Sequence, residues 1–264
     1  MSAIPLSPTD LAVGALLVAF DALLSVLLRL RLHRQVLLAA GRMVVQLVAV
    51  GYILRAVFAL RNPAATLAIV LVMSAIAARE IAARPERKFT GWAGLALSAG
   101  GVAVATVMTV GLALLTAIRP HPWYDARYAV TLVGIVLGSV LNAGSLSLDS
   151  LLLNVTRQRG AVEAQLALGE TFHEATAPLL RDAIRRGLMP IINQMSAAGV
   201  ITLPGIMTGQ ILAGLDPLEA VKYQILLMFL LAGASGLSAL LMAYGALRRL
   251  TDERQRLRLD RLRE

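Results

Sequence analysis

Seven runs of apolar residues follow one another along the chain, separated by shorter polar connections, over residues 11–28, 36–57, 64–79, 92–118, 129–153, 187–212 and 220–247. Each run is close to the roughly 20 residues that an α-helix needs to cross the hydrocarbon core of a bilayer, and the third is the shortest. The pattern therefore predicts an all-α, polytopic membrane protein with seven transmembrane helices in a single domain, residues 1–264.

One long polar segment, residues 157–186, separates the fifth run from the sixth. Its apolar residues recur at roughly helical spacing: Val162, Leu166, Leu168 and Phe172. This spacing predicts a short amphipathic helix on a surface, over 161–171, with Pro178 interrupting the pattern behind it. Two interpretations remain open, because arginines can hold such a helix at the lipid headgroups, and because a helix followed by a break and a basic stretch also suits the docking of a partner protein.

Composition supports the membrane class, and the charge distribution predicts an orientation. The chain is 58% hydrophobic, has a mean hydropathy of +0.73 and contains no cysteine, whereas soluble domains are about 45–50% apolar. If the seven runs cross the membrane, 19 of the 25 Lys and Arg residues fall on one side. The positive-inside rule then places the N-terminus outside and the C-terminus in the cytoplasm. The net charge of +9 is explained by this topology, so no nucleic-acid partner is expected, and we expect the basic tail beyond Arg248 to be a charged helical extension.

Catalytic motifs are missing from the sequence. It has no phosphate-binding loop of the G-x-x-x-x-G-K-[ST] type, no H-E-x-x-H and no G-x-S-x-G, and its three histidines, His33, His121 and His173, lie in different connections. We therefore expect a protein that is not itself an enzyme. Transport against a gradient would take its energy from a partner or from a coupled ion.

Polar residues inside the fifth and sixth runs are candidates for a substrate path. Asn142, Ser145 and Asp149 continue a face begun by Gly134 and Gly138, because the five are spaced by three or four residues. Small and polar residues on one face serve helix packing, and ionisable groups within membrane spans also mark transport routes. Both interpretations of this face stay open.

The sixth run adds Asn193 and Gln194, and Pro204 is expected to kink or unwind the helix near Leu203. A break at membrane depth is tolerated where it faces protein or a water-filled cavity. Met195 and Met207 are candidate soft metal ligands, although methionine also fills gaps in a core.

A pair of opposite charges is predicted between the first two runs. Asp21 and Arg42 lie at similar depths, about 10 Å from the same end of their helices at 1.5 Å per residue. A lone charge at this depth is costly, which favours an ion pair between them.

Several stretches now resemble a known family. Glu163, Ala164, Gln165 and Gly169 resemble the E-A-A-x-x-x-G motif of ABC-transporter permeases, with Gln165 in place of the second alanine. The surrounding stretches 141–149, 163–169, 175–184, 187–193 and 196–223 resemble the FetB-type permease family, which includes a bacterial iron-export permease and plant permeases associated with aluminium tolerance.

The resemblance implies a function and a set of partners. It implies a permease subunit in the plasma membrane (the inner membrane of a bacterium), exporting iron or another metal ion and forming a homodimer with two separate ABC ATPase subunits. ATP and Mg would bind to those subunits, and this chain would bind no cofactor. The coupling contact would be made by Glu163, Ala164, Gln165, Leu168 and Gly169, with Gly169 ending the coupling helix. Two alternatives are export of another small solute such as a nucleotide sugar, and a secondary transporter that works without an ATPase through Asp21, Arg42 and Asp149.

Overall fold

The computed structural model describes residues 7–60, 62–120 and 125–263. The chain forms two compact units. The first consists of Met1–Asn62 and Leu212–Leu215, and the second of Pro63–Ile211 and Asp216–Glu264. His121 lies outside the described residues.

The first unit is a helical hairpin made of α1 (Pro8–Leu27) and α2 (His33–Leu60), which pack against each other. Ser7 begins α1 with a capping box, in which its side chain and that of Asp10 each accept a hydrogen bond from the other residue's backbone N–H. The turn is closed by Ser25, whose Oγ accepts a hydrogen bond from the Leu32 N–H at 2.9 Å. Most of the large apolar side chains of both helices are exposed, as expected of helices whose surroundings are lipid or other apolar protein surfaces.

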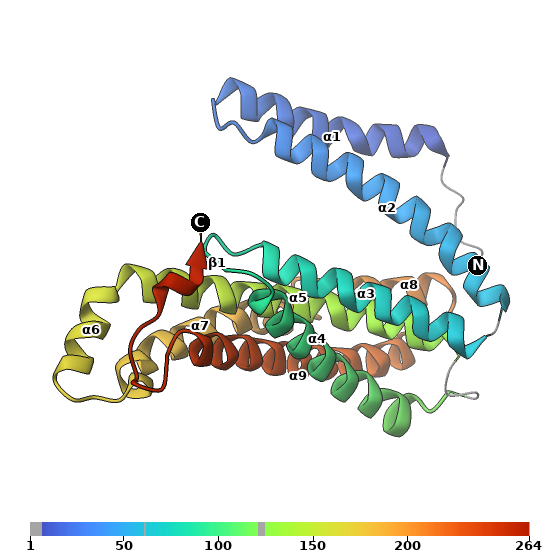
Figure 1. Ribbon diagram of the computed structural model, residues 1–264. Helices are drawn as coiled ribbons and strands as arrows, with labels where there is room; N and C mark the ends of the chain where they lie inside the picture. The colour runs from blue at the N-terminus through green and yellow to red at the C-terminus, as the bar shows by residue number, and fades with distance from the viewer. Residues whose placement is uncertain (1–6, 61, 121–124, 264) are drawn as a thin grey trace. The chain divides into compact units, whose positions relative to one another are not determined.

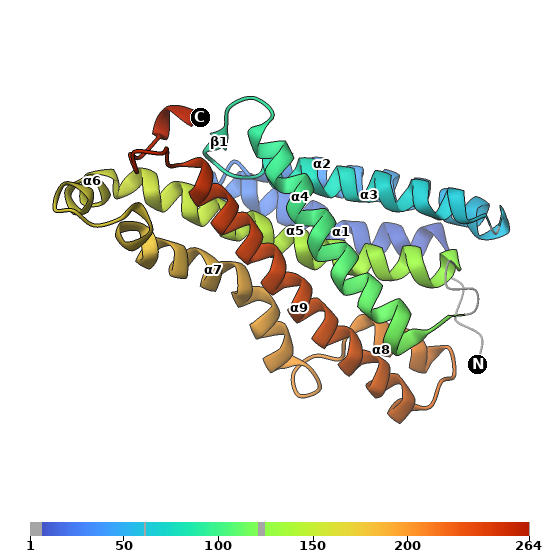
Figure 2. The same ribbon diagram turned by 60° about the horizontal axis from the view of Figure 1, so that its bottom comes forward.

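The second unit contains the other elements that the structure describes, except that Leu212, the last residue of α8, belongs to the first unit. They are α3 (Pro63–Ala83), β1 (Lys88–Phe89), α4 (Ala93–Leu112), the π-helical turn η1 (Ala113–Ile118), α5 (Ala126–Arg157), α6 (Arg159–Ala167), α7 (Phe172–Ala197), α8 (Gly205–Leu212), α9 (Pro217–Arg249), the 3₁₀ turn η2 (Leu259–Arg261) and β2 (Leu262–Arg263). Helix α5 is the centre of this unit, because it packs against α9, α7, α3 and α4, and Figures 1 and 2 show it running beside α7 and α9.

Small and hydroxyl-bearing residues let α5 approach α9 closely. The Ser238 Oγ on α9 donates a hydrogen bond to the Val140 carbonyl at 2.7 Å, and the Ser147 Oγ on α5 donates one to the Ala239 carbonyl at 3.1 Å. These hydroxyls are buried, and each bond satisfies a polar group that would be costly to leave unpaired in an apolar medium.

The structure corrects two expectations, and a third stays a prediction. Among the described residues, six helices are long and apolar enough to cross a membrane, and the run 187–212 is not one of them as a single helix, because α7 ends at Ala197 and α8 begins at Gly205. A seventh crossing by this run therefore stays a prediction. Pro178 does not interrupt the helix, because α7 continues on both sides of it. The proline is exposed, so the carbonyl that it leaves without a donor can be hydrated.

The second correction is in the tail. Helix α9 ends at Arg249 rather than continuing into the tail, which folds back and adds β2 to β1 as a two-residue antiparallel pair, Lys88 opposite Arg263 and Phe89 opposite Leu262. Over the described residues, the regular elements are therefore helical apart from this small sheet.

Candidate functional site

The connection between α5 and α7 carries the first group of predicted site residues. The short helix α6 follows α5 after a single residue, and Figures 1 and 2 show it at the end of the second unit where α5 ends and α7 begins. Val162 is buried, whereas Leu168 is 86% exposed. The Arg159 Nε and the Glu163 Oε1 form an ion pair at 2.8 Å on the exposed side. The amphipathic helix predicted over 161–171 is thus present. It begins two residues earlier than expected, at Arg159, and ends four residues earlier, at Ala167.

Gly169 ends this helix as predicted, through backbone geometry. Its φ of 97° lies in the left-handed region that favours glycine. The Glu170 N–H bonds to the Gln165 carbonyl at 3.2 Å and the Gly169 N–H bonds to the Leu166 carbonyl at 3.1 Å. These two bonds form a Schellman motif, which turns the chain sharply from α6 towards α7.

The first turn of α7 is held from two sides. Thr171 begins the helix with a capping box to Glu174, and the hydrogen bonds from Thr171 lower the pKa of that carboxyl. From the other end of the sequence, the Gln255 Oε1 accepts a hydrogen bond from the Phe172 N–H at 2.7 Å. The C-terminal tail therefore contacts the segment that follows α6. No local pattern in the sequence predicts this contact.

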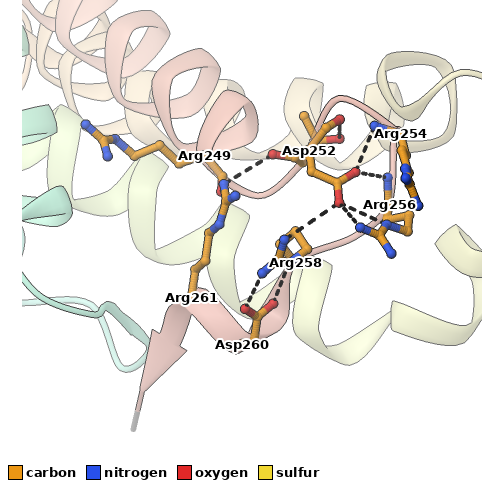
Figure 3. Close-up of polar contacts among 8 residues, drawn as sticks. Arg249, Asp252, Arg254, Arg256, Arg258, Asp260 and Arg261 are labelled. Atoms are coloured by element: carbon orange, nitrogen blue, oxygen red, sulfur yellow. Dashed lines mark hydrogen bonds and ion pairs between the residues drawn. The ribbon is translucent and has the colours of Figure 1, made fainter.

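The tail is organised around one carboxylate, Asp252, as Figure 3 shows. Its Oδ1 accepts hydrogen bonds from the backbone N–H groups of Arg254 and Arg256, both at 3.0 Å, and its Oδ2 accepts one from the Arg256 Nε at 2.9 Å. The side-chain and backbone hydrogen bonds from Arg256 lower the pKa of Asp252 to about 2.

Of two further arginines, Arg258 makes an ion pair within the tail and Arg261 joins the tail to the end of α9 (Figure 3). Arg258 forms a two-pronged pair with Asp260, with both bonds at 2.8 Å, and the Arg261 Nη1 donates to the Arg249 carbonyl at 2.7 Å. The Arg261 carbonyl in turn accepts a hydrogen bond from the Thr90 N–H at 2.9 Å. The tail thus connects the α3–α4 loop, the α6–α7 turn and the end of α9.

The polar stripe of α5, made of Asn142, Ser145 and Asp149, contacts the loop that follows α3. The Asp149 Oδ1 accepts a hydrogen bond from the Glu86 N–H at 2.8 Å, and the Asn142 Oδ1 accepts a long one, 3.5 Å, from the Arg84 Nη1. The Ser145 Oγ bonds within its own helix, to the Leu141 carbonyl at 2.7 Å. These contacts join the stripe to the loop and to its own helix, and its role in a substrate path stays a prediction.

Helix α7 packs on a different side of α5. The Asn154 Nδ2 donates to the Asp182 Oδ2 at 3.1 Å, and Gly187 lies against Ala143 and Ser147. Asn193 and Gln194, near the end of α7, are exposed. Among the described residues, no hydrogen bond joins either of them to the stripe.

The predicted break near Leu203 is confirmed. Gly199 has a φ of 82°, and its N–H bonds to the Thr202 carbonyl at 2.9 Å, while the Thr202 N–H returns to the Ala197 carbonyl at 3.1 Å. The unwound residues 198–204 therefore form a compact turn in which some of the backbone N–H and carbonyl groups are hydrogen-bonded to one another or to the end of α7.

Beside this break lies a cavity of about 590 Å³ that brings together three predicted path residues, Met195, Pro204 and Met207. Helix α9 completes it with Gln224 and Met228, neither of which is marked as a site residue by any local pattern in the sequence. A glutamine in the apolar run of α9 was the available signal, but nothing local indicated that it would meet residues of α7 and α8.

The remaining predictions concern charges and metals. Asp21 on α1 and Arg42 on α2 are both exposed, and their pairing stays a prediction. Among the described residues, no group of three or more His, Cys, Asp or Glu side chains could hold a metal ion.

Comparison with known proteins gives one family. Residues 8–251 match the model of an uncharacterised protein family, UPF0014. A UPF0014 membrane protein of Synechocystis sp. is 39% identical over 86% of this chain and 87% of its own. The probable iron export permease protein FetB of Escherichia coli is 29% identical over 97% of this chain and 96% of its own. The UPF0014 membrane protein STAR2 of rice, Oryza sativa subsp. japonica, is 34% identical over 86% of this chain and 78% of its own. These matches confirm the resemblance to the FetB-type permeases, and no solved structure matches the chain.

Proposed function

Because the chain belongs to the UPF0014 family of membrane proteins, we propose that it is the membrane-spanning permease subunit of an ATP-driven exporter and works with a separate ABC ATPase subunit. The printed name of the Escherichia coli relative, a probable iron export permease protein, supports a permease role and makes iron the first cargo to test. Another metal ion or a small solute such as a nucleotide sugar is the second. A homodimer with two ATPase subunits in the plasma or bacterial inner membrane is the assembly that we propose, with ATP and Mg bound by the ATPase.

The observation that carries this proposal is the way α6 is joined to two long helices. One residue separates it from α5, and the capped turn at Gly169 leads from it into α7. Short connections of this kind transmit displacement, so a partner that tilts α6 would move α5 and α7 together. The same two helices carry the polar stripe and one wall of the cavity.

The exposed side of α6 has the features of a docking surface. Leu168 projects into solvent, and a shallow hollow beside it is lined by Gln165, Glu170 and Arg181, among others. A large apolar side chain next to polar and charged neighbours is typical of an anchor in a protein interface. Glu163, Ala164, Gln165, Leu168 and Gly169 are the residues that we assign to ATPase coupling.

The test is co-purification and reconstitution with a co-expressed ABC-type ATPase subunit. We expect Leu168→Asp to reduce ATPase capture at least ten-fold, because a hot-spot truncation costs about 2 kcal/mol or more. Glu163→Lys should leave ATP hydrolysis running while lowering transport of Fe²⁺ into inside-out vesicles. Leu218→Asp, in the first turn of α9 and 72% exposed, is the matched control and should behave as wild type.

Two results would contradict the proposal. Wild-type ATPase capture by Leu168→Asp together with wild-type coupling by Glu163→Lys would remove α6 from the interface. Transport by the purified chain alone, driven by an ion gradient, would instead support a secondary transporter. A cargo panel of Fe²⁺, another divalent metal and a nucleotide sugar separates the substrate classes in the same vesicles.

A further inference from the structure

The cavity beside the break has the size of an organic ligand. It lies between the last turn of α7, the unwound residues 198–204, α8 and the first turns of α9, and its volume is about 590 Å³. A water molecule takes about 30 Å³ in the liquid, and pockets for small organic molecules span about 300–1,000 Å³. A single metal ion would leave most of this space unfilled.

The lining of the cavity is unsuited to a charged ligand. It contains no Asp, Glu, Lys, Arg or His among the described residues that form it. Three methionines, Met195, Met207 and Met228, contribute flexible and polarisable side chains that adapt to the shape of an apolar guest. An ion in such surroundings would lose its hydration without gaining a counter-charge.

One polar group remains unused in the lining. The Gln224 side chain is 7% exposed, and its Oε1 is buried with no hydrogen-bond partner among the described residues. The primary amide offers both a donor and an acceptor, and rotating it by a half-turn exchanges the two positions. An amide left unpaired in apolar surroundings is costly, and a ligand with one polar group would relieve this cost once the side chain turns its buried oxygen towards the cavity.

We propose that this cavity binds an uncharged, largely apolar organic molecule that carries one hydrogen-bonding group, and that this group pairs with the Gln224 amide. Leu203 and Phe229 also line the cavity and are 65% and 69% exposed, so it opens on the apolar surface of the second unit. Such a molecule partitions into the bilayer and reaches the opening from the lipid. This ligand class goes beyond the proposed metal export, and it does not depend on the ATPase partner.

The test uses the full chain in lipid nanodiscs and a photoreactive ten-carbon alcohol as the probe. We expect saturable crosslinking to peptides of α7, α8 and α9 that line the cavity, and competition by unlabelled 1-decanol. Gln224→Met keeps the side-chain length but removes the amide, and it should weaken the apparent affinity about five-fold, which corresponds to one neutral hydrogen bond. Met207→Trp should abolish the saturable labelling by filling the space.

The matched control is Gln210→Met. Gln210 belongs to α8 and its Oε1 is also buried without a partner among the described residues, yet it is not part of the lining. This variant should bind the probe as wild type does, and thermal unfolding will show whether all three variants are folded. If Gln224→Met does not fold, Met207→Trp alone decides the question.

Three outcomes would overturn the proposal. Labelling of the cavity peptides could equal that of other lipid-facing helices and fail to saturate. Labelling could persist unchanged in Gln224→Met and in Met207→Trp. Ag⁺ at stoichiometric concentration could block the probe in wild type but not after Met195→Leu, which would make the cavity a site for a soft metal ion held by thioethers.

Discussion

Gly187 is a position where a single added methyl group should disturb the second unit. A Cβ added there would lie 2.8 Å from the Ala143 carbonyl oxygen, 3.0 Å from the Ser147 Cβ and 3.1 Å from the Ala239 Cβ. These atoms belong to the backbone or stand next to it, so they cannot move aside cheaply. We expect Gly187→Ala to lower the free energy of unfolding by about 1–3 kcal/mol, as overpacking does.

The control for this substitution is Gly138→Ala on α5. A Cβ there meets nothing within 4 Å, and alanine favours a helix over glycine by up to about 1 kcal/mol. Unfolding of both variants in detergent, followed by circular dichroism, compares them. An unchanged midpoint for Gly187→Ala would show that α5, α7 and α9 are packed loosely enough around Gly187 to admit a methyl group.

Asp252 makes the order of the tail depend on pH in the acidic range. Its pKa is about 2 in the folded protein and 3.8 ordinarily, so the carboxylate is held in its charged form by the folded tail. Its contribution to stability is therefore complete above about pH 4, and it is lost as the pH falls from there towards 2. Hydrogen exchange at the Arg254 and Arg256 amides should accelerate over this window beyond the intrinsic pH dependence of exchange.

Asp252→Asn removes the charge that these amides and arginines surround. We expect fast exchange of the tail in this variant at neutral pH, with no further change down to pH 2. Glu253→Gln, the next residue along the chain, is the control and should keep the behaviour of wild type. A tail that stays protected in Asp252→Asn would contradict the central role of this carboxylate.

At the scale of elements, the tail and the α6–α7 turn should move as one piece. Gln255 is the link, because its Oε1 accepts the hydrogen bond of the Phe172 N–H, the first of α7. We expect Gln255→Leu to leave that N–H without its protein acceptor and to weaken the docking of the tail by about 1 kcal/mol, which is about five-fold in the equilibrium. Proteolysis within residues 250–263 and hydrogen exchange at Phe172 should increase together.

Arg263→Gln is a suitable comparison for Gln255→Leu. Its side chain is exposed in β2, and only its backbone takes part in the pairing with Lys88, so the tail should stay docked. If Gln255→Leu loosened the tail while Phe172 kept its protection, the two elements would be independent.

At the scale of the whole molecule, the number of crossings decides on which side each terminus lies. In the part of the chain that the structure describes, six helices are long and apolar enough to cross a membrane, whereas the charge distribution predicts seven crossings, with residues 187–212 contributing one. The natural chain has no cysteine, so single cysteines can be labelled without background. We expect a maleimide that cannot cross membranes to reach Thr9→Cys from outside the cell and Glu253→Cys only after lysis.

Labelling of both positions from the same side would mean an even number of crossings. In that case α7, the break and α8 would enter and leave on one face instead of spanning, and the positive-inside assignment would fail for the segments before or after them. Expression of both variants at the wild-type level is the control for correct insertion.

Local patterns in the sequence determined much of this protein. Runs of apolar residues predict long helices because a helix in lipid must satisfy its own backbone, and six of the seven runs are such helices. The short amphipathic helix, its end at Gly169 and the break before Pro204 were also predictable, because each depends on neighbouring residues. The family resemblance rested on the same stretches.

Contacts between distant parts of the chain were decided only by the tertiary structure. Pro178 stays within α7 because the packed helix continues on both sides of it, which outweighs the local preference of proline. The tail becomes a strand because β1, more than 170 residues earlier, supplies the partner. Met195 and Met207 meet Met228 and Gln224 because α9 returns beside the break, and no local periodicity encodes such a meeting. The physical reason is that helix formation depends on residues within a few positions, whereas a cavity depends on how whole helices pack.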